Sequence, residues 1–134
     1  RCLDLYAGSG VLGFEAVSRG AASARLVERD SEAASALDLL RQRLDATTVE
    51  VHCADVLTWL QRPAQAFDIV FVDPPYASAL LPATLKSLLD GWLAAGAVVY
   101  LECARGTLQV SAPWTILKSG RTQQVDYALL VTTC

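Results

Sequence analysis

The sequence predicts an α/β fold, in which a mostly parallel sheet carries helices on both faces and ends in an antiparallel hairpin. Three observations support this. Short apolar runs alternate with longer runs of helical periodicity. The run Ile69–Val72 is apolar throughout, as expected of a strand covered on both faces. Beyond Trp114, two strand-like runs follow each other with no helix between them.

Five strands are expected before the hairpin, each short and rich in aliphatic residues. They are Cys2–Ala7, Arg25–Glu28, Val49–Cys53, Asp68–Val72 and Ala97–Glu102. The hairpin is expected to pair Trp114–Leu117 with Val125–Val131 through a connection at 118–123. Because crossovers between parallel strands are right-handed, helices should cover both faces of the sheet and ligands should bind at the carboxyl ends of the strands.

Four helices are expected between these strands. They are Val11–Arg19, Ser31–Leu44, Val56–Gln61 and Leu80–Leu93. In the second helix, the apolar side chains and Arg41 lie near one face, and Ser31 can cap the N-terminus. The apolar members of that face are Ala34, Leu37, Leu40 and Leu44.

Length and composition are those of one folded domain, which spans residues 1–134. The chain has 134 residues, of which 53% are hydrophobic and 19% charged, enough apolar material for a core. No apolar run reaches the roughly 18 residues that span a bilayer, and no signal peptide opens the chain. Residue 1 already falls at the start of the first strand-like run, so we expect an N-terminal segment of the native protein to be missing.

The four cysteines, Cys2, Cys53, Cys103 and Cys134, form no CxxC pair, and three lie in apolar runs. We therefore expect buried, reduced thiols in a cytoplasmic protein. The one histidine, His52, has no clustered partners, which argues against a metal site. A net charge of −3 weighs against a nucleic-acid partner, unless basic side chains gather on one face.

A glycine-rich turn follows the first strand, with Gly8-x-Gly10-x-x-Gly13 leading into a helix. Such a turn lets a ligand approach the backbone closely. Glu28 ends the second strand, where its carboxylate can accept hydrogen bonds from both hydroxyls of a ribose. This spacing fits NAD as well as S-adenosylmethionine. Asp4 favours the second ligand, because a carboxylate attracts the amine of its amino-acid end and repels a pyrophosphate.

Asp55 follows the third predicted strand and allows two interpretations. Its side chain can accept the amine of a bound adenine, or it can cap the helix that starts at Val56. The two roles are compatible, so both remain open.

The segment Asp73-Pro74-Pro75-Tyr76 ends the fourth strand. Two prolines make a stiff loop that presents backbone carbonyls at the strand ends. The Asp73 carboxylate and the Pro74 carbonyl can accept the two N–H groups of an exocyclic amine, which frees the nitrogen lone pair for attack on a methyl group. Tyr76 can stack on a base removed from its stack. No cysteine lies in this loop, which argues against a cysteine nucleophile.

With these motifs, the chain resembles class I methyltransferases, and more closely the bacterial 16S rRNA guanine-N2 methyltransferase family known as RsmD. The similar stretches are Asp4–Ala21, Val27–Asp30, Phe71–Tyr76 and Gly91–Leu93. The resemblance implies a Rossmann-like, seven-stranded sheet with an antiparallel last strand. It also implies S-adenosyl-L-methionine as cofactor and methylation of a guanine amine in small-subunit ribosomal RNA or a partly assembled 30S particle. We expect no membrane contact and a monomer.

The resemblance also implies a set of site residues. The cofactor would be held by Asp4, Ala7, Gly8, Gly10, Glu28 and Asp55. The target base would be held by Asp73, Pro74, Pro75 and Tyr76. The family has a basic N-terminal segment before the first strand, which is absent here. Arg105, Lys118 and Arg121 remain as candidate phosphate contacts or as ordinary solvated charges.

Three alternatives stay open. A DNA adenine-N6 methyltransferase also uses Asp-Pro-Pro-Tyr, but it normally carries a long target-recognition region that does not fit between these compact elements. An NAD-dependent oxidoreductase follows from the literal glycine fingerprint. A cofactor-binding module without activity is the third alternative, and the intact loop at residues 73–76 argues against it.

Overall fold

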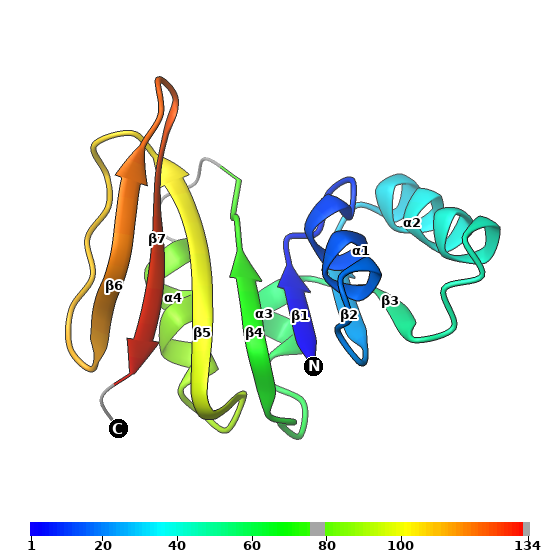
Figure 1. The fold of residues 1–134 in the computed structure, drawn as a ribbon, viewed down its shortest axis with the longest axis horizontal. Coiled ribbons are helices and arrows are strands. Elements are labelled where there is room, and N and C mark those ends of the chain that lie inside the picture. The colour runs from blue at the N-terminus through cyan, green and yellow to red at the C-terminus, as the bar shows by residue number, and fades with distance from the viewer. Residues whose placement is uncertain (76–79, 133–134) are drawn as a thin grey trace.

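The computed structural model describes residues 1–75 and 80–132, which form a seven-stranded sheet in the order β3-β2-β1-β4-β5-β7-β6 (Figure 1). The first five strands pair in parallel, and β7 is antiparallel to both β5 and β6. The predicted α/β class and C-terminal hairpin are therefore confirmed. The strands are β1 Cys2–Leu5, β2 Ala24–Glu28, β3 Val49–Cys53, β4 Phe67–Val72, β5 Leu93–Ala104, β6 Trp114–Arg121 and β7 Val125–Thr132.

The helices cover both faces of the sheet, as predicted. They are α1 Val11–Ser18, α2 Ser31–Arg43, α3 Val56–Trp59 and α4 Leu80–Leu88. Figure 1 shows α1 and α2 on the near face and α3 and α4 behind the sheet. Each face has its own apolar cluster, the smaller around Leu26 and Leu37 and the larger around Trp92 and Leu101. The helices therefore cover the central part of the sheet and leave the carboxyl ends of its parallel strands accessible to a ligand.

Several element boundaries differ from the prediction, among them the ends of β1 and α3 and both ends of β5, and two of the differences follow from local turns. The fourth helix was expected to reach Leu93, but it ends at Leu88 and Leu93 already begins β5. Gly91, at φ 94°, turns the chain there, and Trp92 is buried directly after it. In the hairpin, β6 continues past Leu117 because the Thr122 N–H donates to the Val125 carbonyl at 2.8 Å, which makes the turn shorter than expected.

Strand β4 is less covered by helices than its apolar sequence predicted. Val70 and Val72 are fully buried against the larger cluster, but Ile69 on the other face is 40% exposed. Ile69 and Phe71 line a hollow of about 540 Å³ beside α1. The expectation of two covered faces is wrong here, because α1 and α2 pack over β1, β2 and β3 rather than over β4.

The second helix also departs from its predicted capping and burial. Asp30, not Ser31, caps α2, since its carboxylate accepts the Ala33 N–H at 2.9 Å. On the predicted face, Ala34 and Leu37 are buried, whereas Leu40 and Leu44 are exposed. Figure 1 shows α2 extending past β3, the edge strand, so the last turns of the helix have no sheet beneath them.

The cysteines are free in the part of the chain that the structure describes, and Cys134 lies outside it. Cys2 is buried and Cys103 is half-buried. Cys53 contradicts the expectation of burial, because it closes the edge strand β3 and is exposed. Among residues 1–75 and 80–132, no group of His, Cys, Asp and Glu could hold a metal ion, and no helix has the length and apolar character to cross a membrane.

We predict that Gly13→Ala destabilises the protein by about 1–3 kcal/mol, because an added methyl overpacks the core. Its Cβ would overlap Leu26 Cδ2 and lie 3.2 Å from Asp4 Oδ2, and Leu26 is fully buried. In an ordinary helix the same change would stabilise by about 1 kcal/mol. Chemical denaturation measures whether Gly13→Ala lowers or raises the free energy of unfolding. Ser18→Ala, in the exposed last turn of α1, is the control.

Candidate active site

A cavity of about 1340 Å³ opens at the carboxyl edge of the parallel strands. Of the predicted site residues, Glu28, Asp55, Asp73, Pro74 and Pro75 line it. Asp4, Ala7, Gly8 and Gly10 lie in β1 and the turn that follows it and are not part of the lining. Tyr76 lies outside the described residues. The structure therefore gathers residues from β2, β3, β4 and their loops around one space, as the topology requires.

The glycine turn fixes the Glu28 carboxylate. Gly8 and Gly10 take positive φ angles of 58° and 76°, which glycine adopts without strain. The Gly8 N–H donates to Glu28 Oε1 at 2.8 Å, and the Asp30 N–H donates to Oε2 at 2.8 Å. Each carboxylate oxygen still has acceptor capacity for a second donor. Glu28 is thus held in one orientation and can accept a pair of hydroxyl groups.

Asp4 lies buried beneath this turn, only 3% exposed. Its Oδ2 accepts the Gly13 N–H at 3.1 Å. The pKa of Asp4 is raised to about 7, chiefly by burial; the Gly13 N–H acts to lower it, and the negative charges of Asp73 and Glu28 act to raise it. A positive charge placed above the turn would favour the ionised form of Asp4. The site therefore suits a ligand with a cationic group.

Asp55 caps the short helix α3, as one of its two interpretations predicted. Its Oδ2 accepts both the backbone N–H and the hydroxyl of Thr58, each at 3.1 Å. Because both bonds use Oδ2, Oδ1 can accept another donor. Asp55 also lines the cavity, so the second interpretation, an acceptor for an adenine amine, stays a prediction.

The loop after β4 brings Asp73 and Pro74 to the cavity. Asp73 directly follows a strand whose Val72 is buried, and it is more exposed than Val72. Partial burial raises the pKa of Asp73, and the nearby negative charge of Glu102 raises it further. A carboxylate of raised pKa is a better proton acceptor than an ordinary aspartate.

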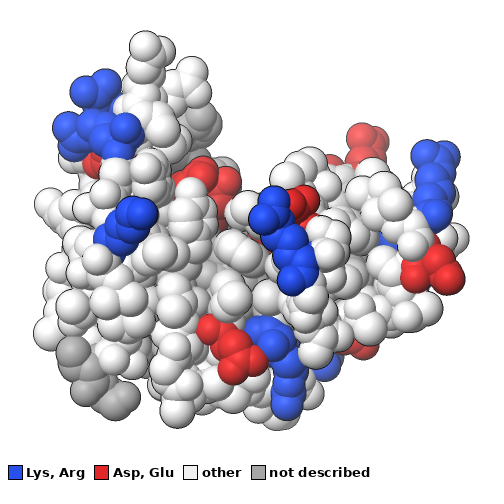
Figure 2. Space-filling model, viewed as in Figure 1, with Lys and Arg blue, Asp and Glu red and all other residues white. Residues whose placement is uncertain are grey.

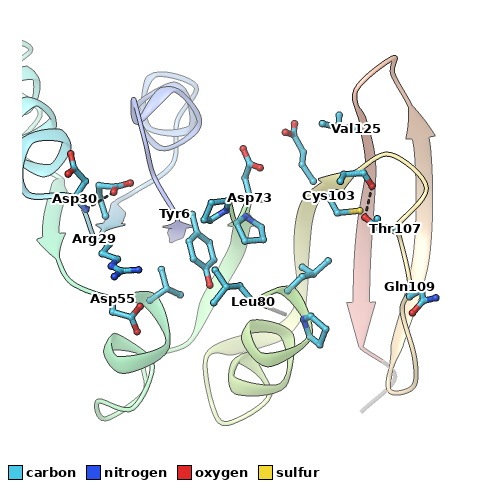
Figure 3. Close-up of a pocket in the computed structure, with 18 of the residues that line it drawn as sticks. Tyr6, Arg29, Asp30, Asp55, Asp73, Leu80, Cys103, Thr107, Gln109 and Val125 are labelled. Atoms are coloured by element: carbon cyan, nitrogen blue, oxygen red, sulfur yellow. Dashed lines mark hydrogen bonds between the residues drawn. The ribbon is translucent and has the colours of Figure 1, made fainter. Parts of the chain in front are cut away.

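Tyr6 is a lining residue that sequence reasoning missed. It has a φ of 63°, unusual for a residue other than glycine, and lies between Asp55 and Asp73 in Figure 3. Its hydroxyl is 2.7 Å from Thr84 Oγ1. Because the Thr84 hydroxyl donates to the Leu80 carbonyl at 2.6 Å, the Tyr6 hydroxyl is the donor. The sequence feature that could have identified Tyr6 was its position as an aromatic residue directly before the glycine turn.

Glu102 is the second missed residue, and it completes a row of carboxylates. Glu28, Asp4, Asp73 and Glu102 belong to the ends of β2, β1, β4 and β5, which are neighbours in the sheet. Figure 2 shows acidic atoms beside the hollow at the upper ends of β4 and β5. The signal for Glu102 was its place as the last residue of the fifth predicted strand. The row makes this edge negative and attractive to cations.

Basic side chains gather elsewhere, over the upper end of β6 in Figure 2. Arg121, a candidate phosphate contact, is paired within the chain, with its Nε 2.6 Å from Asp126 Oδ1. Its charge is therefore partly neutralised by a partner within the chain, whereas Arg105 and Lys118 stay candidate phosphate contacts as predicted.

This combination of fold and site defines a class of protein. Parallel strands in the order β3-β2-β1-β4-β5, with antiparallel β7 between β5 and β6, form the Rossmann-like sheet of class I methyltransferases. The ribosomal protein L11 methylase of Lactobacillus delbrueckii shares this fold, with a TM-score of 0.82 at 17% identity over 98% of this chain and 69% of that chain. The chain belongs to the family described as conserved hypothetical protein 95, whose model matches residues 1–131.

Similar proteins span nearly the whole chain. Ribosomal RNA small subunit methyltransferase D of Escherichia coli K12 is 39% identical over 132 residues, which cover 96% of this chain and 67% of the relative. The Haemophilus influenzae protein of that name is 36% identical, with coverage of 96% and 69%. The solved structure of Escherichia coli yhhF has a TM-score of 0.91 at 39% identity, covering 96% of this chain and 75% of that chain.

We predict that Asp4→Asn flattens the dependence of stability on pH. The pKa of Asp4 is raised in the folded state to about 7 from an ordinary 3.8, so its contribution to stability is full below pH 4 and is lost as the pH rises through 7. Relative to the variant, the wild-type chain should lose about 3 kcal/mol of unfolding free energy between pH 4 and pH 8.

Urea denaturation at several pH values tests this expectation. The exposed Asp90, in the turn after α4, provides the matched control Asp90→Asn, which should follow the wild-type curve. Parallel curves for wild type and Asp4→Asn would show that Asp4 titrates normally in the folded protein.

Proposed function

We propose that this chain transfers a methyl group from S-adenosyl-L-methionine to the exocyclic N2 amine of a guanine in 16S ribosomal RNA. The observation that carries the proposal is Asp73-Pro74 at the end of β4, where a carboxylate and a backbone carbonyl that could accept an exocyclic amine belong to the lining of the large cavity. The relatives named ribosomal RNA small subunit methyltransferase D support small-subunit ribosomal RNA as the substrate. We further propose that it acts in the cytoplasm as a monomer on a partly assembled 30S particle.

The residues present fit the cofactor. Glu28, fixed by two backbone N–H groups, would hold the ribose hydroxyls, and Asp55 Oδ1 would accept the adenine amine. Asp4, buried without a cation among its close contacts in the described residues, would stabilise the ligand's amino group. When bound, S-adenosyl-L-methionine supplies an electrophilic methyl group on a sulfonium. The row of carboxylates favours such a positive ligand over a neutral one.

The chain's own contribution to the chemistry is to position the amine and receive its proton. The lone pair of an exocyclic amine is delocalised into the base. Asp73 and the Pro74 carbonyl accept its two N–H bonds, which draws the nitrogen toward tetrahedral geometry and frees the lone pair. The raised pKa of Asp73 suits it to take the proton that the nitrogen releases. Tyr76, the proposed stacking residue, lies outside the described residues, and its role stays a prediction.

The oxidoreductase alternative fits this turn poorly. A dinucleotide fold binds pyrophosphate through free backbone N–H groups of the glycine turn. Here the Gly8 N–H already donates to Glu28 and the Gly13 N–H to Asp4. A pyrophosphate at this place would also meet the charges of both carboxylates.

The loop at residues 73–76 does not distinguish an adenine methyltransferase from the proposed guanine enzyme. The two differ in how much of this chain their relatives match. A tRNA1(Val) (adenine(37)-N6)-methyltransferase of Escherichia coli is 39% identical to this chain, but over only 79 residues, or 57% of the chain. Adenine and guanine enzymes can therefore share the core of the fold. Tritiated methyl transfer to 30S particles, followed by mass spectrometry of the nucleosides, decides between them. N2-methylguanine supports the proposal, and N6-methyladenine or label only on duplex DNA contradicts it.

We predict that Asp73→Ala lowers kcat by about 100- to 1,000-fold, since one preorganised hydrogen-bond partner of the reacting group is lost. Binding of S-adenosylhomocysteine, measured by calorimetry, should stay within a few-fold of wild type. Asp90→Ala, in an exposed turn away from the cavity, is the matched control and should retain full activity. An active Asp73→Ala variant would remove this residue from the reaction.

We also predict that S-adenosylhomocysteine binds more tightly as the pH rises through about 7, because the ligand's amine favours ionised Asp4. Asp4→Asn should weaken binding about tenfold near pH 8 and remove the pH dependence. Calorimetric titrations at several pH values measure both effects. A variant that keeps the wild-type pH dependence would show that another group is responsible.

A further inference from the structure

Glu102 lies next to Asp73 at the carboxyl edge of the sheet. In the parallel pair β4–β5, Val72 is in register with Leu101, so Asp73 and Glu102 each follow by one residue. Neighbouring strands lie about 4.8 Å apart. Both residues line the cavity, and the charge of Glu102 raises the pKa of Asp73. Two carboxylates therefore face the same space side by side.

The Glu102 side chain is held in place by its own strand. The Tyr100 hydroxyl donates to Glu102 Oε1 at 2.7 Å. The Tyr100 ring is in turn fixed between Phe71, at 6.3 Å edge-on, and Tyr127, stacked at 6.4 Å. With Oε1 engaged, Oε2 can accept a donor from a ligand. The arrangement has the preorganisation expected of a recognition residue rather than of a solvated surface charge.

Guanine and adenine differ in the hydrogen-bonding groups that they would present to the Glu102 carboxylate. Guanine presents its N1–H donor directly beside the N2 amine, so one edge offers three N–H groups. Adenine presents an unprotonated N1, an acceptor, beside its N6 amine. Asp73, Pro74 and a third acceptor would satisfy all three guanine donors, whereas the N1 lone pair of adenine would face a negative charge.

We propose that Glu102 accepts the N1–H of the target guanine and thereby selects guanine over adenine, with Tyr100 as its positioning residue. This inference rests on the proposed function and names the residue that would set its base specificity. A site built around a hydrogen bond rejects an analogue that lacks the donor, because the buried acceptor is then left unpaired.

The test uses 2-aminopurine, which keeps the N2 amine but has an acceptor at N1. Once the methylated guanine is mapped, small-subunit RNA with guanine or 2-aminopurine at that position is assembled into particles. The wild-type chain should methylate guanine about 10- to 100-fold faster, in kcat/KM, than 2-aminopurine. In Glu102→Gln the amide can donate to N1, so guanine activity should fall and 2-aminopurine activity should rise until the preference disappears or inverts.

Two further variants complete the experiment. Tyr100→Phe keeps the ring but removes the hydroxyl, and should weaken the preference for guanine less than Glu102→Gln does. Glu50→Gln, an identical change on the exposed edge strand β3, should keep the wild-type preference. Thermal unfolding and binding of S-adenosylhomocysteine establish that each variant is folded. If Glu102→Gln does not fold, the Tyr100→Phe preference alone decides.

The outcomes separate this inference from the proposed function. Methylation of guanine by the wild type, with an unchanged guanine preference in folded Glu102→Gln, overturns only the role of Glu102. Methylation of adenine by the wild type overturns both. A merely structural role for Glu102 would lower both activities together and leave their ratio unchanged, which also contradicts the inference.

Discussion

The register of four parallel strands is the constraint on which the site depends. Because β2, β1, β4 and β5 are neighbours and run the same way, the residues that end them meet at one edge whatever their distance along the chain. Glu28 and Asp73 are 45 positions apart by number, yet both line the same cavity. The hydrogen bond from Gly8 to Glu28 joins the turn after β1 to the end of β2 and fixes this edge further.

Placing carboxylates together is unfavourable unless something offsets their repulsion. Here burial is the main cause of the raised pKa of Asp4 and of Asp73, and repulsion from neighbouring carboxylates raises the pKa of both groups as well. Three of the four carboxylates are also supported by a neutral donor: Gly13 for Asp4, Gly8 for Glu28, Tyr100 for Glu102. A scaffold of neutral donors holds the geometry while leaving the negative charge available to a positively charged ligand or to the N–H groups of a base.

Much of the site at the carboxyl ends of the parallel strands could be predicted, because the sequence motifs that mark it are local. The Gly8 turn and the Asp73 loop lie at strand ends that hydrophobic patterning locates well. The errors arose where tertiary packing decides. Ile69 reads as buried, yet α1 and α2 pack over β1, β2 and β3 and leave it 40% exposed, and Leu40 and Leu44 lie on an apolar face that extends past the last strand. Glu102 was missed because its importance comes from the register of β4 with β5, which a one-dimensional pattern does not contain.

The hydroxyl contact between Tyr6 and Thr84 has a consequence for how the molecule responds to ligands. It ties the start of the glycine turn to α4, 78 positions away in the chain, and both segments contribute lining residues to the cavity. Thr84 is fully buried, so the two segments cannot move independently without breaking this bond. A ligand that binds more tightly while this bond is formed would favour the bonded position of α4, and by thermodynamic reciprocity a ligand that favours that position of α4 would tighten binding at the turn. The two substrates of such an enzyme would be coupled through one threonine.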